Sequence, residues 1–349
     1  MVFLRFLVNL VFRIGIIELF LVFFVLVNAI TFFLYVIDKR RAKNNAWRIR
    51  ESILLFFTLA CGGIGAALAM HFARHKTQKN IFRFTAFVGV IIAIIPMVHI
   101  AHSLTLDRII RYVEVEFRSE NWPAELNGYR IAFMTDMHLI ADHSMKNVVT
   151  ELNGRDIDLL LLGGDFSMRS NHYQGTIREI SKAITTDGIF GVEGNHDVYD
   201  QLFLAMEQYG ITPLDNSGTR IRHGFYLAGV HDLWNREPSI AQSTDGADTD
   251  DFVLLLSHNP DVSMQQSTSS VDLILAGHTH GGQITFFGFP MYLLRGSITD
   301  YGTHFAHGFA YSKDGTPVFT SRGIGTYYNV PRVFARPEVI IFTMYSHTS

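Results

Sequence analysis

The chain has 349 residues, too many for a typical single domain, and its formal net charge of −3 conceals two oppositely charged parts. Residues 1–111 hold 14 Lys and Arg against 4 Asp and Glu, a net charge of +10, whereas residues 112–349 hold 15 against 28, a net charge of −13. The acidic second part argues against nucleic-acid binding, which needs a basic surface, and the single cysteine, Cys61, excludes a disulfide framework or a thiolate metal site.

Three long apolar stretches occupy the basic first part. Residues 19–37, 52–72 and 84–106 contain no Lys, Arg, Asp or Glu, and each is close to the ~20 residues that a helix needs to cross a bilayer. The first stretch is not a cleavable signal, because it is long and no small-residue cleavage site follows it. We therefore expect residues 1–110 to form a transmembrane domain of about three helices.

Basic residues between these stretches bear on orientation, because they favour the cytoplasmic side. Both loops are basic, the first with Lys39, Arg40, Arg41, Lys43, Arg48 and Arg50, the second with Arg74, Lys76, Lys79 and Arg83. Three full crossings place only one loop inside. We favour three crossings with the first loop, which has more basic residues, in the cytoplasm, because Arg108 and Arg111 are then cytoplasmic as well. The C-terminal part then also lies in the cytoplasm. If Cys61–Gly65 instead form a re-entrant hairpin, both loops lie inside and the C-terminal part outside.

This first part also resembles a small bacterial membrane domain of unknown function over residues 25–105. The matching residues are Asp38–Ala42, Trp47–Glu51, Gly62, Gly63 and Gly65, and Arg74–Thr77. The resemblance implies no chemistry. We attribute the basic residues to membrane topology and to contact with lipid headgroups.

The second part alternates strand-like and helix-like segments. Strands are predicted at residues 130–135, 157–162 and 189–192, separated and followed by helices at 146–152, 177–184 and 201–209. Further strands are predicted at residues 225–230, 252–256, 273–276, 318–321 and 339–344. We expect a linker at residues 111–127 and then an α/β domain at residues 128–349, built from two facing sheets flanked by helices.

Five of these strands end in residues that bind metals. The segments are Asp136-Met137-His138, Gly163-Gly164-Asp165, Gly194-Asn195-His196-Asp197, Ser257-His258 and Gly277-His278-Thr279-His280. Ligands in open α/β sheets collect at the carboxyl ends of strands, so the five segments are expected to converge. Burying several carboxylates and imidazoles together without cations would be costly. The pattern therefore predicts a metal centre.

The order and spacing of these motifs resemble the calcineurin-like metallophosphoesterase superfamily, and within it a bacterial membrane-associated phosphodiesterase group. The resemblance implies a four-layer sandwich of two mixed sheets between helices, and two divalent metal ions, with Mn, Fe or Zn suited to the ligands. It implies one metal held by Asp136, His138, Asp165 and His280, and a second held by Asp165, Asn195, His258 and His278.

The same resemblance implies catalytic roles. A water between the metals would supply the nucleophile, and His196 would protonate the leaving oxygen, with Asp197 orienting its imidazole. Arg322, in a Gly-flanked loop after a strand, is a candidate for binding a substrate phosphate. We expect several further histidines to be surface or loop residues, namely His143, His231, His304 and His307.

The substrate class is less constrained. Residues 286–309, just after the last predicted ligands, are rich in aromatic and aliphatic residues. The segment is either a flap lying on a membrane or a loop packed over the core. With the membrane domain, it favours an inner-membrane bacterial enzyme that hydrolyses a phosphodiester or pyrophosphate of a lipid-linked substrate. The alternatives are a phosphoprotein or small-molecule phosphatase, and a non-catalytic binding module. The oligomeric state is left open.

Overall fold

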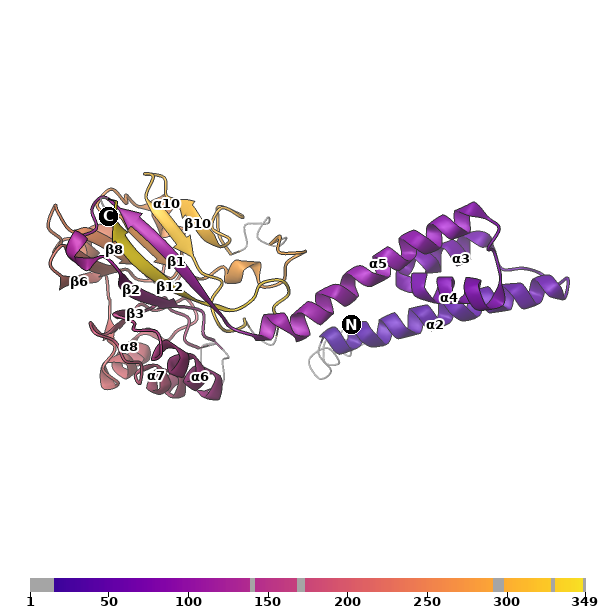
Figure 1. Cartoon of the computed structure of the whole chain (residues 1–349), viewed down its shortest axis with the longest axis horizontal. Coiled ribbons are helices and arrows are strands. Elements are labelled where there is room, and N and C mark those ends of the chain that lie inside the picture. Colours follow the sequence, from indigo (N-terminus) through magenta and orange to yellow (C-terminus); the bar gives the residue numbers. More distant parts are fainter. Residues whose placement is uncertain (1–15, 139–141, 168–172, 291–297, 328–329, 348–349) are drawn as a thin grey trace. The chain divides into compact units, whose positions relative to one another are not determined.

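The computed structural model describes residues 16–138, 142–167, 173–290, 298–327 and 330–347. The chain divides into two compact units, residues 1–101 and residues 102–349. The first is helical and the second combines helices with two sheets (Figure 1). Each unit has a buried core of its own.

The first unit is built from the three apolar stretches. It contains α2 (Ile16–Lys43), α3 (Glu51–Phe57), the π-helical turn η1 (Thr58–Gly62), α4 (Gly63–Ala73) and α5 (Asn80–Leu104). Three helical segments, Glu18–Lys43, Glu51–Ala73 and Asn80–Arg108, are long and apolar enough to cross a membrane. The middle segment differs from the other two because it is not straight.

The helix breaks at η1, in the middle of this segment. Ala60 has ψ 48° and Cys61 has φ 66°, so neither residue is helical. The side chain of Asn28, from α2, donates to the carbonyl of Cys61 at 2.9 Å and accepts from the N–H of Gly65 at 2.8 Å. One amide thus satisfies two backbone groups at the break, which is required where water cannot reach them.

Glycines allow the broken segment to pack against its neighbours. A Cβ on Gly63 would lie 2.0 Å from the carbonyl carbon of Gly89 in α5, and a Cβ on Gly65 would lie 2.1 Å from the carbonyl oxygen of Asn28. Only glycine permits such close backbone approach. The residues that suggested a possible break therefore form one.

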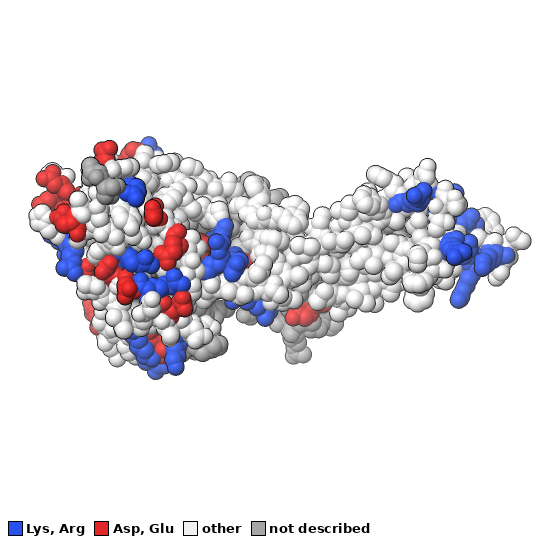
Figure 2. Space-filling model, in the orientation of Figure 1, with Lys and Arg blue, Asp and Glu red and all other residues white. Residues whose placement is uncertain are grey.

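The two ends of the middle segment lie together. Glu51, which begins α3, accepts from Lys76 at 2.5 Å and from Lys79 at 2.6 Å, both just beyond the end of α4. The segment is therefore a helical hairpin whose two ends meet, which is the geometry of the alternative that the glycines suggested. Figure 2 shows the Lys and Arg side chains of this unit gathered at one end.

The second unit has two six-stranded sheets. The first sheet has the order β1 (Arg111–Ser119), β12 (Glu338–Ser346), β2 (Tyr129–Met134), β3 (Leu159–Leu162), β4 (Ile189–Gly191) and β5 (Thr212–Pro213). The second has the order β10 (Gly308–Tyr311), β11 (Pro317–Thr320), β9 (Leu273–Ala276), β8 (Phe252–Leu256), β7 (Phe225–Gly229) and β6 (Ser217–Arg222). Both sheets are mixed, with β2 to β5 parallel in the first and β7, β8, β9 and β11 parallel in the second.

Helices cover the outer faces, which confirms the predicted four-layer sandwich. α6 (Asp142–Leu152), α7 (Tyr173–Ile180) and α8 (Tyr199–Gln208) pack on the first sheet through side chains such as Val148, Ile177 and Met206. α9 (Ile240–Ser243) and α10 (Val262–Gln265) pack on the second. Between the sheets lie Phe133, Leu161, Leu254, Phe342 and their neighbours. Central strands such as β3 are wholly apolar because both of their faces are buried.

The segment predicted as a linker at residues 111–127 belongs to the fold. β1 forms the edge of the first sheet and runs parallel to β12 from Arg111 opposite Glu338 to Ser119 opposite Ser346. Its alternate residues Val113, Val115 and Phe117 pack against the core between the sheets. This period-2 pattern is the signal that the linker prediction overlooked.

Candidate active site

The polar motifs follow β2, β3, β4, β8 and β9, as their placement in the sequence predicts. Five of their residues adopt the left-handed backbone conformation, namely Asp136 (φ 53°), His138 (φ 39°), Asp165 (φ 57°), His278 (φ 71°) and His280 (φ 52°). Side-chain-bearing residues seldom take this conformation, and those that do cluster at functional sites. The strand ends are bent in order to turn these side chains toward one place.

Glycines beside these residues leave room for the bends. A Cβ on Gly277 would lie 2.2 Å from Thr135 Oγ1 and 2.5 Å from Asp136 Oδ2. A Cβ on Gly194 would lie 2.3 Å from Asp165 Oδ1. Any larger residue at either position would displace an aspartate of the site.

The first cluster contains Asp136, His138, His280 and Asp165. His280 Nε2 lies 3.2 Å from Asp136 Oδ1 and 3.0 Å from His138 Nε2. His138 Nε2 lies 3.3 Å from Asp165 Oδ2. All four side chains are buried, and their donor atoms converge on one point.

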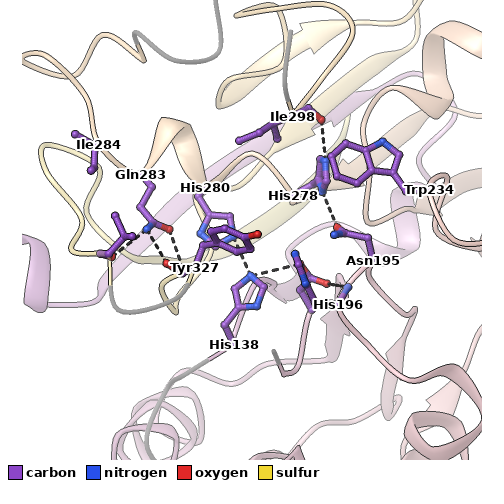
Figure 3. A pocket seen from close by; sticks show the side chains of 12 residues that line it. His138, Asn195, His196, Trp234, His278, His280, Gln283, Ile284, Ile298 and Tyr327 are labelled. Atoms are coloured by element: carbon purple, nitrogen blue, oxygen red, sulfur yellow. Dashed lines mark hydrogen bonds and ion pairs between the residues drawn. The ribbon is translucent and has the colours of Figure 1, made fainter. Parts of the chain in front are cut away.

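The second cluster shares Asp165 with the first. Asp165 Oδ2 lies 3.3 Å from His258 Nε2, which in turn lies 3.2 Å from Asn195 Oδ1. His278 Nδ1 lies 3.0 Å from Asn195 Oδ1 (Figure 3) and 3.3 Å from His258 Nε2. One carboxylate oxygen of Asp165, Oδ2, therefore lies 3.3 Å from a histidine of each cluster.

Backbone carbonyls fix the orientation of three of the imidazoles. His138 Nδ1 lies 3.4 Å from Ser167 O, His258 Nδ1 lies 2.7 Å from Gly163 O, and His278 Nε2 lies 2.9 Å from Ile298 O. Each carbonyl accepts the proton of the ring nitrogen beside it, so the other nitrogen is turned toward the cluster, where it presents a lone pair when the ring is neutral. Metal-binding histidines are oriented in this way by their surroundings.

Burial and charge also suit these groups to hold a cation. Burial lowers the pKa of His138 to about 4 and that of His278 to about 3, which keeps both rings neutral. Burial opposes the ionisation of Asp165, but His258 and His138 still hold the pKa of Asp165 below its usual range. Against the effect of burial, Asp165 and Asp136 raise the pKa of His258, so a cation would displace a proton there.

The donor spacing fits metal ions. Donors held about 2.1 Å from a cation lie about 3.0 Å apart in octahedral geometry and about 3.4 Å apart in tetrahedral geometry. The contacts within both clusters range from 3.0 to 3.3 Å. Lone pairs that face one another at this spacing repel unless a cation lies between them. Two groups of these residues, Asp136 with His138 and His280, and Asp136 with Asp165 and His258, are geometrically able to hold an ion.

Residues 129–282 match the family model described as calcineurin-like phosphoesterase. These residues belong to the calcineurin-like phosphoesterase family. Residues 28–82 match a second model, described as a protein of unknown function (DUF1294). The phosphoesterase match contains all seven predicted metal ligands, and the second match covers the end of α2 and the helical hairpin.

Curated relatives carry the same family name. An uncharacterised metallophosphoesterase of Campylobacter jejuni is 26% identical over 305 residues, which cover 83% of this chain and 78% of the relative. A transmembrane protein with a metallophosphoesterase domain from Danio rerio is 25% identical over 315 residues, 82% of this chain and 69% of the relative. A phosphodiesterase of Escherichia coli is 28% identical over 241 residues, 62% of this chain and 82% of the relative.

His196 of the phosphoesterase domain lies beside the first cluster. Its ring centre is 5.5 Å from that of His138 and 5.1 Å from that of Tyr327. Its backbone N–H donates to Asp165 Oδ1 at 2.8 Å, so the loop that carries it is fixed to the bridging carboxylate. The ring lines the cavity above the clusters, where a leaving group would be.

Asp197 has a different position from the one predicted. Its carboxylate accepts four backbone N–H groups, those of Asp165, Phe166, Ser167 and Gly194, at 2.8 to 3.2 Å. Burial and the charge of Asp165 raise the pKa of Asp197, and these donors oppose that shift. Asp197 therefore holds the loop of Asp165 to the loop of Asn195, which replaces its predicted role of orienting the His196 imidazole.

Arg322 lies outside the lining of the cavity. Its backbone N–H donates to Glu338 Oε1 at 3.0 Å, and its Nη1 lies 3.5 Å from Glu338 Oε2. Arg322 would have to leave Glu338 in order to bind a substrate phosphate. Nearby, the buried Arg332 donates to the carbonyls of Gly325 and Arg322, both at 2.8 Å.

A cavity of about 320 Å³ opens above the metal-binding residues of the phosphoesterase domain. Besides the clusters and His196, it is lined by Trp234, Gln283, Ile284, Ile298, Tyr327 and Val330 (Figure 3). Gln283 holds the loop that carries Tyr327 and Val330 in place, since its Nε2 donates to the carbonyls of Tyr327 at 3.2 Å and Val330 at 3.0 Å. None of these six residues was predicted from the sequence, although Gln283 directly follows the Gly-His motif.

The end of β7 adds a further element that the sequence did not reveal. His231 lies in the loop after β7, as expected, but it is buried, with Nδ1 3.0 Å from Glu193 Oε1 and Nε2 2.8 Å from Asp215 Oδ1. Its neighbour Asn235 donates to the carbonyl of Asn195 at 2.7 Å. This strand end therefore supports the loop that carries a predicted metal ligand.

Proposed function

We propose that this protein is a membrane-bound, metal-dependent phosphoesterase that hydrolyses a phosphodiester or pyrophosphate bond in a lipid-linked substrate. The observation that carries the proposal is the pair of clusters that share Asp165 Oδ2, with lone pairs converging at 3.0 to 3.3 Å. Such an arrangement is costly to bury without cations. Its position at the floor of a cavity gives a substrate access to it.

The chain supplies two sets of ligands that overlap at one residue. Asp136, His138, His280 and Asp165 would hold one ion, and Asp165, Asn195, His258 and His278 the other. Two divalent cations, Mn, Fe or Zn, would offset phosphoryl charge and lower the pKa of a bound water. His196, beside the first set, would give a proton to the leaving oxygen. Asp197 would hold the loop of Asp165 to the loop of Asn195.

The cavity walls favour a lipid-linked substrate. Above the polar floor, the wall is formed by Trp234, Ile284, Ile298, Tyr327 and Val330, all apolar or aromatic. A small hydrophilic phosphate ester would gain nothing from these side chains, whereas an acyl or isoprenoid chain would bury apolar surface against them. The three apolar helical segments would keep the enzyme in the membrane that holds such substrates.

The hairpin also changes the side of the membrane that we propose for the catalytic unit. Asp38, near the end of α2, accepts from Arg48 at 2.8 Å and His75 at 2.7 Å, one from each basic loop. Both loops therefore lie at the same end of the helical unit. With both in the cytoplasm, α5 leads outward, and the catalytic unit would lie outside the cytoplasmic membrane of a bacterium.

Reporter fusions test the orientation. Alkaline phosphatase fused after residue 347 is expected to be active, because it folds only outside the cytoplasm, and a green fluorescent protein fused there is expected to stay dark. The opposite pair of results would return the catalytic unit to the cytoplasm. A fusion within the loop at residues 44–46 should give the reverse of the C-terminal result and serves as the internal control.

Activity tests the reaction. The full chain, purified in detergent and stripped of metals, is incubated with Mn, Fe or Zn and assayed against bis(4-nitrophenyl) phosphate, a nitrophenyl monoester and a lipid-linked pyrophosphate. We expect metal-dependent cleavage of the diester and the lipid. Activity confined to the monoester would favour a phosphatase. No activity with any metal, despite bound ions, would favour the non-catalytic binding module.

A further inference from the structure

A tight turn beside the cavity presents three exposed phenylalanines. Phe286, Phe287 and Phe289 are 50 to 52% exposed. The backbone N–H of Phe286 donates to Phe289 O at 2.9 Å, and that of Phe289 donates to Phe286 O at 3.0 Å. Gly288 donates to Thr285 Oγ1 at 2.9 Å. The turn is thus hydrogen-bonded across its base while its rings face outward. Apolar rings exposed to water in this way are unfavourable unless another surface covers them.

The turn is packed against the segment where α5 ends. The ring of Phe287 lies 5.2 Å from that of Phe334, which stacks on His102 at 3.9 Å. His102 belongs to the last turn of α5. Asp107, just beyond, accepts from His102 Nδ1 and from the backbone N–H of Phe334, both at 2.8 Å. A buried carboxylate thus fixes the loop of Phe334, and with it the turn, beside the end of the apolar segment.

Residues around this junction extend the apolar surface. Leu106 is 43% exposed and Ile109 is 55% exposed, on either side of the buried Asp107. Ile284, 44% exposed, precedes the turn and pairs with Val333, next to Phe334. We call Leu106, Ile109, Ile284, Phe286, Phe287 and Phe289 the junction patch. It is continuous with a segment, Asn80–Arg108, that is apolar enough to lie in a membrane.

The junction patch also reaches the cavity. Ile284 belongs to both, because it is exposed in the patch and lines the cavity. Val330 and Tyr327, which also line the cavity and whose carbonyls accept from Gln283 beside Ile284, are 37% and 38% exposed. Basic residues accompany this surface: Arg108 and Arg111 are exposed, and Arg336 donates to the carbonyl of Ile109 at 3.4 Å. Cations beside an apolar surface suit phosphate headgroups above acyl chains.

We propose that the junction patch enters the lipid bilayer that α5 crosses, so that the cavity opens at the membrane surface. A lipid-linked substrate would then reach the metal-binding residues along Ile284 without leaving the bilayer. The insertion stands on the patch and its continuity with α5, whereas the path for the substrate rests on the proposed function. The occupant is a phospholipid bilayer, because the adjoining segment already requires one.

Quenching by lipids tests the insertion. In the full chain carrying Cys61→Ala, single cysteines replace Phe287 or Phe289 and carry an environment-sensitive fluorophore. The protein is placed in vesicles of phosphatidylcholine and phosphatidylglycerol, with or without brominated acyl chains. We expect strong quenching by the brominated lipid at both positions. Ile184 and Leu204, exposed by 72% and 67% on the same unit, provide matched control positions that should not be quenched.

Equal quenching at the patch and control positions, or none at either, would overturn the insertion. Quenching only at the patch would support it whatever the substrate is. A fluorophore could itself seek the membrane, so the same dye at the controls is essential. Unlabelled Phe287→Trp, read by its emission wavelength in vesicles against Leu204→Trp, gives a second measurement without a dye.

Kinetics test the path for the substrate. The triple variant Phe286→Ser, Phe287→Ser, Phe289→Ser lies outside the cavity lining. It should raise KM for a lipid-linked diester about tenfold or more, because bilayer contact is lost, while bis(4-nitrophenyl) phosphate is cleaved as before. The control variant Ile184→Ser, Leu204→Ser should change neither. Parallel losses on both substrates with a lower melting temperature would mean that the patch is part of the core.

The two proposals can fail separately. If wild-type protein cleaves the soluble diester but no lipid, the lipid substrate is wrong, and quenching still decides on the insertion. If it cleaves lipid equally well with and without the phenylalanines, the path is wrong while the proposed reaction stands.

Discussion

Two of the groups in which the described residues bury aspartate beside histidine, one group from each unit, differ in what balances the charge. In the helical unit, Asp38 is fully buried and accepts from His75, from Arg48 and from the backbone N–H of Ile49, with Lys76 Nζ 3.8 Å away. In the catalytic unit, Asp136 and Asp165 face imidazoles, and among the described residues no Lys or Arg pairs with either.

The comparison separates a structural site from a functional one. The Asp38 group carries its own cations, so it is complete and joins the two basic loops. The Asp136 and Asp165 groups are incomplete without an added cation. A histidine beside a buried aspartate is therefore no evidence of a metal site by itself. The evidence lies in the absence of basic side chains around the carboxylates and in ring nitrogens whose lone pairs converge.

Of the variants considered, Asp165→Asn, in the group that lacks its own cation, should have the largest effect on activity. The neutral amide cannot hold two cations, and loss of the metals should lower turnover of a phosphodiester by about 10⁴-fold. Elemental analysis should find fewer than two ions per chain. Asn195→Ala is the matched control, expected to lose the second ion and keep the first. Two ions in Asp165→Asn protein would remove Asp165 from the bridge.

Asp38→Asn should break the complete group. Removing the carboxylate leaves the buried His75 and the exposed Arg48 without their charged partner and Lys76 with Glu51 alone, which should destabilise the helical unit by about 3 kcal/mol. Thermal unfolding of the full chain in detergent measures this loss. Cleavage of the soluble diester by folded protein should not change. A selective loss of activity without loss of stability would mean that Asp38 serves the reaction rather than the fold.

His196→Ala should act on chemistry and leave metal binding intact. An alkyl diester, whose leaving oxygen needs a proton, should be cleaved about 10²-fold more slowly. A nitrophenyl diester, with a good leaving group, should be affected less. Equal losses on the two substrates would exclude His196 as the general acid.

Asp197→Asn should have the smallest effect and should fall on stability. The amide cannot accept from all four backbone N–H groups, so the free energy of unfolding should drop by about 1–3 kcal/mol. If Asp197 instead oriented His196, the variant would show the leaving-group dependence of His196→Ala. The ratio of alkyl to nitrophenyl turnover in folded Asp197→Asn protein distinguishes the two roles, and an unchanged ratio supports the structural one.

The positions of the predicted metal ligands were foreseeable because each lies just after an apolar strand, so the local sequence determines where it falls. The cavity wall was not. Trp234, Tyr327 and Val330 lie in loops without a motif, and only tertiary packing brings them beside His278 and His196. For Asp197, proximity in sequence suggested the wrong partner, because its carboxylate turns to backbone groups about thirty residues away.

The helical unit shows a similar limit. The sequence contains the glycines that make a hairpin possible, and the hairpin was one of the two arrangements that it allowed. The group that stabilises the break, Asn28, precedes the break by 33 residues in the chain. For the aromatic segment, Phe305 is buried whereas Phe286 and Phe287 are exposed, so the core prediction holds for Phe305 and the membrane flap stays a prediction. Met291 to Leu294 lie outside the described residues, as does His143's side chain.

The position of β12 has a consequence for the order in which the protein is made. β12 lies between β1 and β2, and Arg111 at the start of β1 pairs with Glu338, so nearly the whole catalytic unit is synthesised between the two strands. Until β12 emerges, β2 has an open edge and β1 has no partner among the described strands. The first sheet therefore closes only after the metal-binding loops have been translated. If this unit crosses a membrane before it folds, as we propose, the late closure of the sheet would keep the chain unfolded during export.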